Sequence, residues 1–246
     1  MKISVRRASA AALERENHMA DVSQKTAVLF DLDGTLTDPG VGITNSVMYA
    51  LRAYGIAAER EALYRFIGPP LTDSFEQFYG FSHEKAVEAV EIYREYYRKT
   101  GIFENSVYAG IRALLAALRQ AGKTVIMATS KPEVFAVQIA ERFALTPFFH
   151  VIAGSCLNGE RVHKDEVIRY ALARAGMDTS DAVMVGDREY DLRGAHACGM
   201  QAVGVLYGYG SQAELSAAGA DAIAPDVRSL RRILLAAPAA LDTSTK

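Results

Sequence analysis

Four aspartates stand directly after two apolar runs of the chain. Asp31 and Asp33 follow Ala27–Phe30, and Asp187 and Asp191 follow a second run of the same kind. In an open parallel sheet ligands bind beyond the carboxyl ends of the strands, so we expect these acids to converge. Several carboxylates sharing one site need a hard divalent cation, and few protein ligands combined with a substrate phosphate favour Mg²⁺.

Two hydroxyls and a lysine have the complementary chemistry. Thr129 and Ser130 end another apolar run, and their hydroxyl and N–H groups can hold phosphate oxygens. Lys164 would offset the charge of a transferring phosphoryl group. Lys131 is an alternative for that charged role, and the residues alone leave the choice open. We expect His163 to be a loop residue rather than a ligand.

The strands and helices that must position these groups alternate along the chain. Continuous apolar runs are typical of strands buried on both faces, and intervening helical patterns of about 10–15 residues indicate βαβ units. The pattern therefore predicts an α/β fold with a doubly wound, Rossmann-like parallel sheet. The expected strands are Ala27–Phe30, Thr124–Ala128, Val151–Ala153, Ala182–Val185 and Ala202–Leu206. The expected core helices include Val134–Phe143, Val167–Ala175 and Asp191–Ala197.

About 90 residues without a strand pattern interrupt this alternation. Because one helix suffices for a crossover, the additional helices predict an inserted α-helical cap domain. The expected cap helices are Ile43–Tyr54, Ala58–Phe66, Leu71–Tyr79 and Glu84–Thr100. The predicted divisions are an N-terminal extension over 1–25, disordered or weakly helical, a catalytic core over 26–40 and 106–236, a helical cap over 41–105, and a tail over 237–246.

The polar residues at the strand ends resemble a known family. Asp31-Leu32-Asp33-Gly34-Thr35 is similar to the DxDGT signature of the haloacid dehalogenase superfamily. Thr129, Lys164 and the segment Gly186–Asp191 match its second, third and fourth motifs in order, over about residues 26–236. The subgroup that looks most similar, from Ile67–Leu71 and the Gly186–Asp191 segment, is the phosphoglycolate-phosphatase-like and nucleotidase-like enzymes with a helical cap.

The resemblance implies a role for each motif residue. It implies Asp31 as the nucleophile that forms an aspartyl-phosphate, and Asp33 as general acid and then base. The implied Mg²⁺ ligands are Asp31, Asp187 and the backbone carbonyl of Asp33, and Asp191 is implied to support the metal through water or through the other ligands. The implied phosphate-binding residues are Gly34, Thr129, Ser130 and Lys164.

The cap is expected to select the substrate. Candidate contacts are Asn45 on the first cap helix, Gly68 in the Gly-Pro-Pro loop and Arg94 on the long helix. Tyr96 and Tyr97 lie beside Arg94, and tyrosines at such positions more often serve in packing than in ligand contact.

The sequence leaves three functions open. The first is a Mg²⁺-dependent phosphatase for a small organic monoester, phosphoglycolate-like, with a 5′-nucleotidase acting on nucleoside monophosphates as the alternative. The second is a β-phosphoglucomutase-like phosphomutase or a phosphonate-cleaving relative. The third is a non-catalytic binding protein, which would be expected to lack Asp31 or Asp33, and both are present.

Composition narrows the possible partners. With 27 basic and 29 acidic residues among 246, the net charge of −2 gives no electrostatic reason to expect nucleic acid or an anionic membrane as partner. No apolar run reaches the length of a bilayer span. Cys156 and Cys198 stand far apart with no CxxC, which indicates a reducing, cytoplasmic setting. The expected partner is a small phosphorylated metabolite; nothing in the sequence predicts the oligomeric state.

Overall fold

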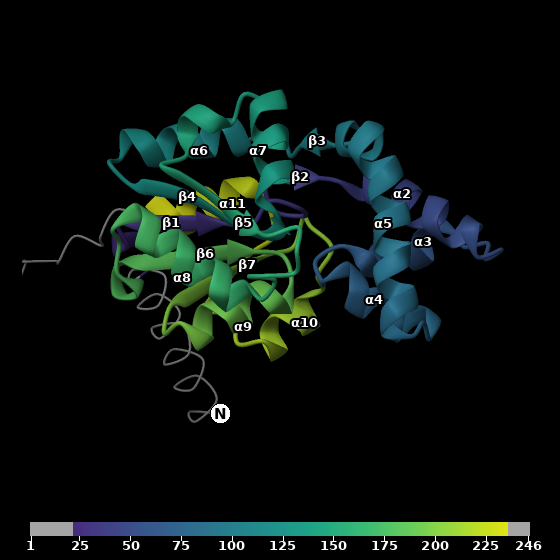
Figure 1. Ribbon diagram of the computed structural model, residues 1–246. Helices are drawn as coiled ribbons and strands as arrows, with labels where there is room; N and C mark the ends of the chain where they lie inside the picture. The colour runs from purple at the N-terminus through teal and green to yellow at the C-terminus, as the bar shows by residue number, and fades with distance from the viewer. Residues whose placement is uncertain (1–21, 236–246) are drawn as a thin grey trace, which may run out of the picture.

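A computed structural model describes residues 22–235 and contains a six-stranded parallel sheet (Figure 1). The first strand, β1, is central, with two strands on one side and three on the other, which confirms the doubly wound α/β fold. In spatial order the strands are β5 (Val151–Ser155), β4 (Thr124–Pro132), β1 (Ala27–Phe30), β6 (Ala182–Gly186), β7 (Gln201–Val205) and β8 (Ala222–Ala224). The three-residue β8 was not predicted.

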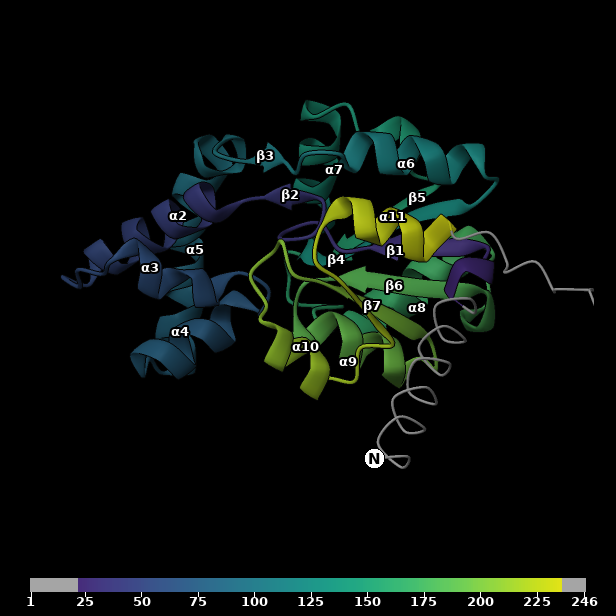
Figure 2. The same ribbon diagram turned by 180° about the vertical axis from the view of Figure 1, so that it is seen from behind.

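Helices cover both faces of the sheet, as Figures 1 and 2 show from opposite sides. Side chains alternate along a strand, so Val28 and Phe30 belong to one apolar cluster, and Ala27 and Leu29 to the other. The first cluster is covered by α6 (Ile111–Gln120), α7 (Glu133–Arg142) and α11 (Val227–Leu235). The second is covered by α8 (Lys164–Ala175), α9 (Glu189–Ala197) and α10 (Gln212–Ala217).

A helical layer lies beyond the carboxyl ends of the strands (Figure 1). It contains α2 (Gly40–Ala53), α3 (Arg60–Leu63), the 3₁₀ turn η1 (Tyr64–Phe66), α4 (Leu71–Tyr79), α5 (His83–Lys99) and the 3₁₀ turn η2 (Gly101–Phe103). This layer is the predicted cap, and the expected helix Ala58–Phe66 divides into α3 and η1. Aromatic rings fill its interior: the ring centroid of Phe75 lies 5.1 Å from that of Phe66 and 5.9 Å from that of Phe81.

A two-stranded antiparallel ladder joins the cap to the core. The strands β2 (Thr37–Asp38) and β3 (Ser106–Val107) pair Thr37 with Val107 and Asp38 with Ser106. Neither strand was predicted, because two residues are too few to produce a pattern. The ladder holds the start and the end of the cap side by side.

The described chain begins at Val22 and ends at Leu235. The predictions for the extension and the tail concern mainly residues 1–21 and 236–246, which lie outside the described residues. Val22 is fully buried, and the carbonyl of Ser23 accepts a hydrogen bond from Lys123 Nζ at 2.8 Å. Of the helices within residues 22–235, none combines the length and apolar character needed to cross a membrane.

Candidate active site

Three of the four predicted aspartates converge at the carboxyl edge of the sheet. Asp31 follows β1, Asp187 follows β6, and Asp191 lies in the first turn of α9. Carboxylate oxygens of the three lie within 4.8 Å of one another, and all three side chains are buried. Such a set of oxygen donors fits a hard divalent cation.

Lys164 supplies a positive charge to this cluster from the first residue of α8. Its Nζ lies 2.7 Å from Asp31 Oδ1 and 2.7 Å from Asp191 Oδ1, and it donates to the carbonyl of Ala128 at 3.2 Å. Burial alone would lower the pKa of Lys164, but the two carboxylates outweigh it and raise that pKa. The lysine is therefore a fixed cation that faces the predicted nucleophile.

One lysine does not neutralise three buried carboxylates. Burial, followed by the charges of Asp191 and Asp31, raises the pKa of Asp187 well above its usual range. Burial also raises the pKa of Asp191, against the opposing effect of Lys164. Asp187 accepts hydrogen bonds from Thr35 Oγ1 at 3.3 Å and from the Tyr209 N–H at 2.8 Å, so its position is determined even though its charge is unfavourable. A bound cation would relieve this repulsion, which supports the fit of a metal to these residues.

Asp33 has a different environment. Its Oδ2 lies 2.6 Å from Lys131 Nζ, and its Oδ1 is buried with no hydrogen-bond partner among residues 22–235. Burial raises the pKa of Asp33, although Lys131 opposes the shift. The side chain of Asp33 is not among the three clustered carboxylates, so its predicted contact with a metal depends on its backbone carbonyl alone. Both lysines that the sequence left as alternatives thus lie in the site, Lys131 beside Asp33 and Lys164 beside Asp31 and Asp191.

The predicted phosphate-binding residues border the same space. Thr129 is the last buried residue of β4, Ser130 follows it, and both line the main cavity. The Thr129 Oγ1 accepts a hydrogen bond from the Lys131 N–H at 3.3 Å, and the Ser130 carbonyl accepts one from Ser155 Oγ at 2.7 Å. The backbone at Gly34 has φ of 82°, and a Cβ there would collide with the Asp187 carboxylate.

Gly34 yields a direct prediction. Gly34→Ala forces both a left-handed alanine and an overlap with a buried carboxylate, so we expect the free energy of unfolding to fall by about 2–4 kcal/mol. Chemical denaturation measures this loss. Gly55→Ala is the matched control, because Gly55 also has a positive φ, of 72°, but a Cβ there would meet nothing within 4 Å. Equal losses in the two variants would show that the overlap with Asp187 has no cost.

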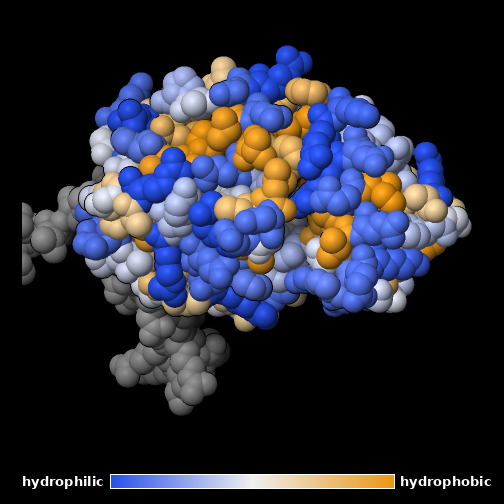
Figure 3. Space-filling view, in the orientation of Figure 1, coloured by the Kyte–Doolittle hydropathy of each residue, from blue (hydrophilic) through white to orange (hydrophobic). Residues whose placement is uncertain are grey.

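A cavity of about 320 Å³ connects this cluster to the cap. Its floor is formed by the strand-end residues, and its roof by cap residues that are mostly apolar but include Thr72, Glu91 and Arg94. The apolar roof residues include Ile43, Phe66, Leu71, Val87, Val90, Tyr93 and Tyr97. Figure 3 shows apolar side chains at the surface on both sides of the boundary between α7 and α5. The space is therefore charged at the core end and mainly apolar at the cap end, where one ion pair, Arg94 with Glu91, also lines it.

The three cap residues that were expected to contact substrate differ in whether they line the cavity. Gly68 and Arg94 line the cavity, and Arg94 is ion-paired with Glu91. Asn45 is not among the lining residues, because its amide is bonded elsewhere. Its Nδ2 donates to Glu104 Oε2 at 2.9 Å, and its Oδ1 accepts from Arg60 Nη2 at 2.8 Å. These partners hold the Asn45 amide away from the cavity lining, and a contact between Asn45 and substrate stays a prediction.

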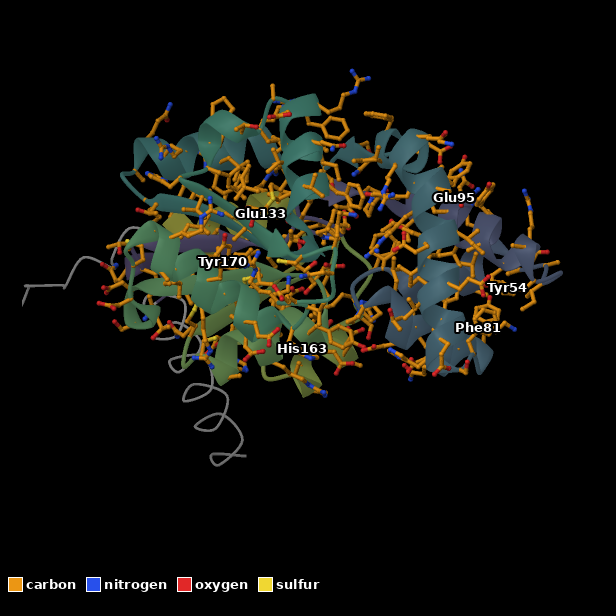
Figure 4. The ribbon with its side chains drawn as sticks, in the orientation of Figure 1. Tyr54, Phe81, Glu95, Glu133, His163 and Tyr170 are labelled. Atoms are coloured by element: carbon orange, nitrogen blue, oxygen red, sulfur yellow. The ribbon has the colours of Figure 1, made fainter. Side chains whose placement is uncertain are left out.

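Two arginines that the sequence did not single out help to shape the cavity. Arg188, between the fourth-motif aspartates, pairs with Glu214 at 2.8 Å and donates to the cap carbonyl of Ile67. Arg161 donates to the Gly154 carbonyl at 2.9 Å and stacks over Tyr170, 3.6 Å from the ring centroid. Tyr170 is labelled on the core in Figure 4. The one sequence signal that identifies Arg188 is its position directly after the motif aspartate Asp187.

Glu133, at the start of α7, connects this helix to β5 and to α8. Its Oε2 accepts a hydrogen bond from the Gly154 N–H at 3.1 Å, and its Oε1 lies 3.2 Å from Arg174 Nη1 (Figure 4).

His163, also labelled in Figure 4, precedes α8, and Glu166 Oε2 accepts a hydrogen bond from the His163 N–H at 3.2 Å. Leu157 and Asn158 of the loop after β5 line the cavity. These contacts hold one side of the cavity in place without involving the carboxylate cluster.

Comparisons with known proteins agree with this geometry. The chain is 49% identical over 208 residues to a 5′-nucleotidase of Pseudomonas aeruginosa, covering 84% of this chain and 94% of that protein. It is 41% identical to the tyrosine-protein kinase PtkA of Mycobacterium tuberculosis, covering 74% of this chain but only 62% of PtkA. It is 26% identical to a phosphoglycolate phosphatase of Vibrio vulnificus, covering 85% of this chain and 95% of that protein.

A solved structure supports the same grouping. A protein from Clostridium acetobutylicum, described as a predicted phosphatase, superposes with a TM-score of 0.85 at 46% identity, covering 87% of this chain and 99% of that one. A family model described as haloacid dehalogenase-like hydrolase matches residues 28–205, which include every core motif discussed above. The chain belongs to the haloacid dehalogenase-like hydrolases.

Proposed function

We propose that this protein is a Mg²⁺-dependent phosphatase that hydrolyses a small organic phosphate monoester through an aspartyl-phosphate on Asp31. The observation that carries the proposal is the buried cluster itself: three carboxylates within 4.8 Å, with Lys164 Nζ 2.7 Å from Asp31. The free thiols of Cys156 and Cys198 suit a cytoplasmic location.

The metal would be held by Asp31, Asp187, Asp191 and the backbone carbonyl of Asp33. When bound there, a divalent cation supplies the positive charge that lets an anionic carboxylate approach an anionic phosphate.

Each catalytic residue of the chain then has a separate role in the reaction. The Asp31 carboxylate attacks phosphorus, and the bond from phosphorus to the leaving oxygen breaks. Asp33 gives its proton to that oxygen and later takes one from the water that hydrolyses the aspartyl-phosphate, which restores the starting state. Burial around Asp33 raises its pKa, which suits a proton donor. Lys164 and Thr129 hold the phosphoryl oxygens.

The cavity favours a leaving group with an uncharged, flat body over phosphoglycolate. A phosphoglycolate carboxylate would need a cation that has no other carboxyl partner, yet each cation that lines the cavity already contacts a carboxyl group among the described residues. Those pairs are Lys131 with Asp33, Lys164 with Asp31 and Asp191, Arg94 with Glu91, and Arg188 with Glu214. The roof is mainly apolar and aromatic, which suits a nucleobase, and the relative at 49% identity is named a 5′-nucleotidase.

A substrate panel tests this proposal. With Mg²⁺, we expect kcat/KM for phosphate release from nucleoside 5′-monophosphates to exceed that from 2-phosphoglycolate by about 10-fold or more, because stacking of one base is worth about 1–3 kcal/mol. EDTA should abolish release, and excess Mg²⁺ should restore it. Faster release from phosphoglycolate would reverse the substrate assignment. Consumption of a sugar phosphate without free phosphate would indicate a phosphomutase, and activity that persists in EDTA would refute the metal dependence.

A further inference from the structure

A chain of buried polar contacts runs from the cap to the proposed proton donor. Tyr97, on cap helix α5, accepts a hydrogen bond from Lys131 Nζ at 2.7 Å. The same Nζ lies 2.6 Å from Asp33 Oδ2. Tyr97 is 2% exposed, and the side chains of Lys131 and Asp33 are 7% and 12% exposed. Little water reaches these contacts, so they are stronger and more directional than exposed ones.

The ring of Tyr97 is itself fixed by packing. It stacks against Tyr93 of the same helix, with ring centroids 5.4 Å apart and an interplanar angle of 15°. It also packs edge-on against Phe135 of core helix α7 at 5.4 Å. The hydroxyl that meets Lys131 is therefore held by rings from both the cap and the core.

Lys131 determines how Asp33 is aimed. The ammonium holds one carboxyl oxygen, Oδ2, while the other, Oδ1, is buried without a partner among the described residues, and Asp33 lines the cavity. The free oxygen is thus the one available to a leaving group. When Asp33 transfers its proton, the carboxylate that forms lies beside the charge of Lys131, which stabilises it.

We propose that Tyr97 is a positioning residue for proton transfer: through Lys131 it holds the Asp33 carboxyl toward the leaving oxygen, so that the cap completes the catalytic machinery of the core. The proposal rests on the phosphatase function proposed above. In the step concerned, the phosphorus–oxygen bond to the leaving group breaks, a bond from Asp31 to phosphorus forms, and the Asp33 proton passes to the departing oxygen. Lys131 and Tyr97 gain and lose no proton.

Comparing substrates with different leaving groups distinguishes a positioning role of Tyr97 from a purely structural one. An alkyl monoester leaves as an alkoxide that needs a proton, whereas p-nitrophenyl phosphate releases a stabilised phenolate that does not. For Tyr97→Phe we expect kcat to fall about 10-fold on the alkyl monoester that the wild type hydrolyses fastest, as part of a general-acid contribution of about 10²–10⁴-fold. On p-nitrophenyl phosphate, kcat should change by less than about twofold.

Two further variants sharpen the experiment. Tyr96→Phe is the matched control, because the Tyr96 hydroxyl lies on the same helix but contacts Glu104 at 3.3 Å, and both rates should stay at the wild-type value. Lys131→Gln removes the charge and should cause a larger loss, again selective for the alkyl substrate. It keeps the proposal testable if Tyr97→Phe fails to fold, which thermal unfolding would reveal.

The possible failures are distinguishable. Equal losses on both substrates, an effect on KM alone, or no effect of either variant would overturn the positioning role and leave the phosphatase function intact. If the wild type releases no phosphate from any monoester, or if release from p-nitrophenyl phosphate survives Asp31→Asn, the phosphatase proposal fails and the positioning role fails with it.

Discussion

Replacing Asp31 by asparagine is expected to reduce phosphate release from every substrate by at least about 10³-fold, because the amide cannot attack phosphorus. The substitution preserves the shape of the side chain and removes only its charge. Lys164 keeps its 2.7 Å contact with Asp191, so the lysine is not left unpaired. We therefore expect a folded protein whose loss is chemical rather than structural.

Steady-state rates and an acid quench measure this loss. The wild type stopped in acid during turnover should retain phosphate bound to the chain, and Asp31→Asn should retain none. Asp73→Asn is the matched control, because Asp73 is exposed in the first turn of α4, far from the motif residues in sequence, and should leave both readouts unchanged. Retained activity in Asp31→Asn would eliminate the covalent mechanism.

Asp187→Asn is expected to stabilise the protein in EDTA while abolishing its activity with Mg²⁺. The fully buried Asp187 carries a charge that burial and its acidic neighbours make unfavourable, which is why its pKa is raised. Removing that charge should raise the free energy of unfolding by about 1–2 kcal/mol, even after the loss of one hydrogen bond. Activity should fall by at least about 100-fold, because a metal ligand is lost.

The pH dependence of this gain has a definite sign. Because the folded pKa of Asp187 lies above its unfolded value of 3.8, the folded wild type is penalised increasingly as pH rises from that value through the folded pKa. The advantage of Asp187→Asn in EDTA should therefore grow as pH rises above 3.8 and level off once the pH exceeds the folded pKa of Asp187. Thermal unfolding in EDTA and in Mg²⁺ measures both effects: added Mg²⁺ should raise the Tm of the wild type and leave that of the variant unchanged. A lower Tm for the variant than for the wild type in EDTA would show that the cost of burying the Asp187 charge beside its acidic neighbours does not outweigh the hydrogen bond that is lost.

The core of the fold was predictable because its signals are local. Four-residue runs such as Ala27–Phe30 are apolar throughout, and only a strand covered on both faces needs that pattern. Since parallel strands share one carboxyl edge, the positions of Asp31 and Asp187 after their strands also predicted that they meet. Lys164, distant in sequence, was assigned through the family resemblance rather than through a physical pattern.

The remaining features depend on contacts that no local pattern records. The strands β2 and β3 have two residues each and exist because they pair with one another. Asn45 lies on the expected helix, but its direction is decided by Arg60 and Glu104, which only the folded cap brings near. Tyr97 looks like any packing tyrosine until Lys131 is found at its hydroxyl.

The ladder between β2 and β3 has a consequence for how such a protein can diversify. It brings the first and last residues of the inserted segment together as hydrogen-bonded neighbours, so the spacing between them does not depend on what lies in between. The parallel sheet contains no residue of that segment, and its register is therefore independent of it. A different segment grafted at Thr37–Asp38 and Ser106–Val107 would meet the same closed junction, which keeps the entropic cost of closing the loop low. Most residues around Asp31 belong to the core and can therefore stay the same when the cap is replaced by another segment. The exception is the cap partner of Lys131, which any replacement segment would have to provide again.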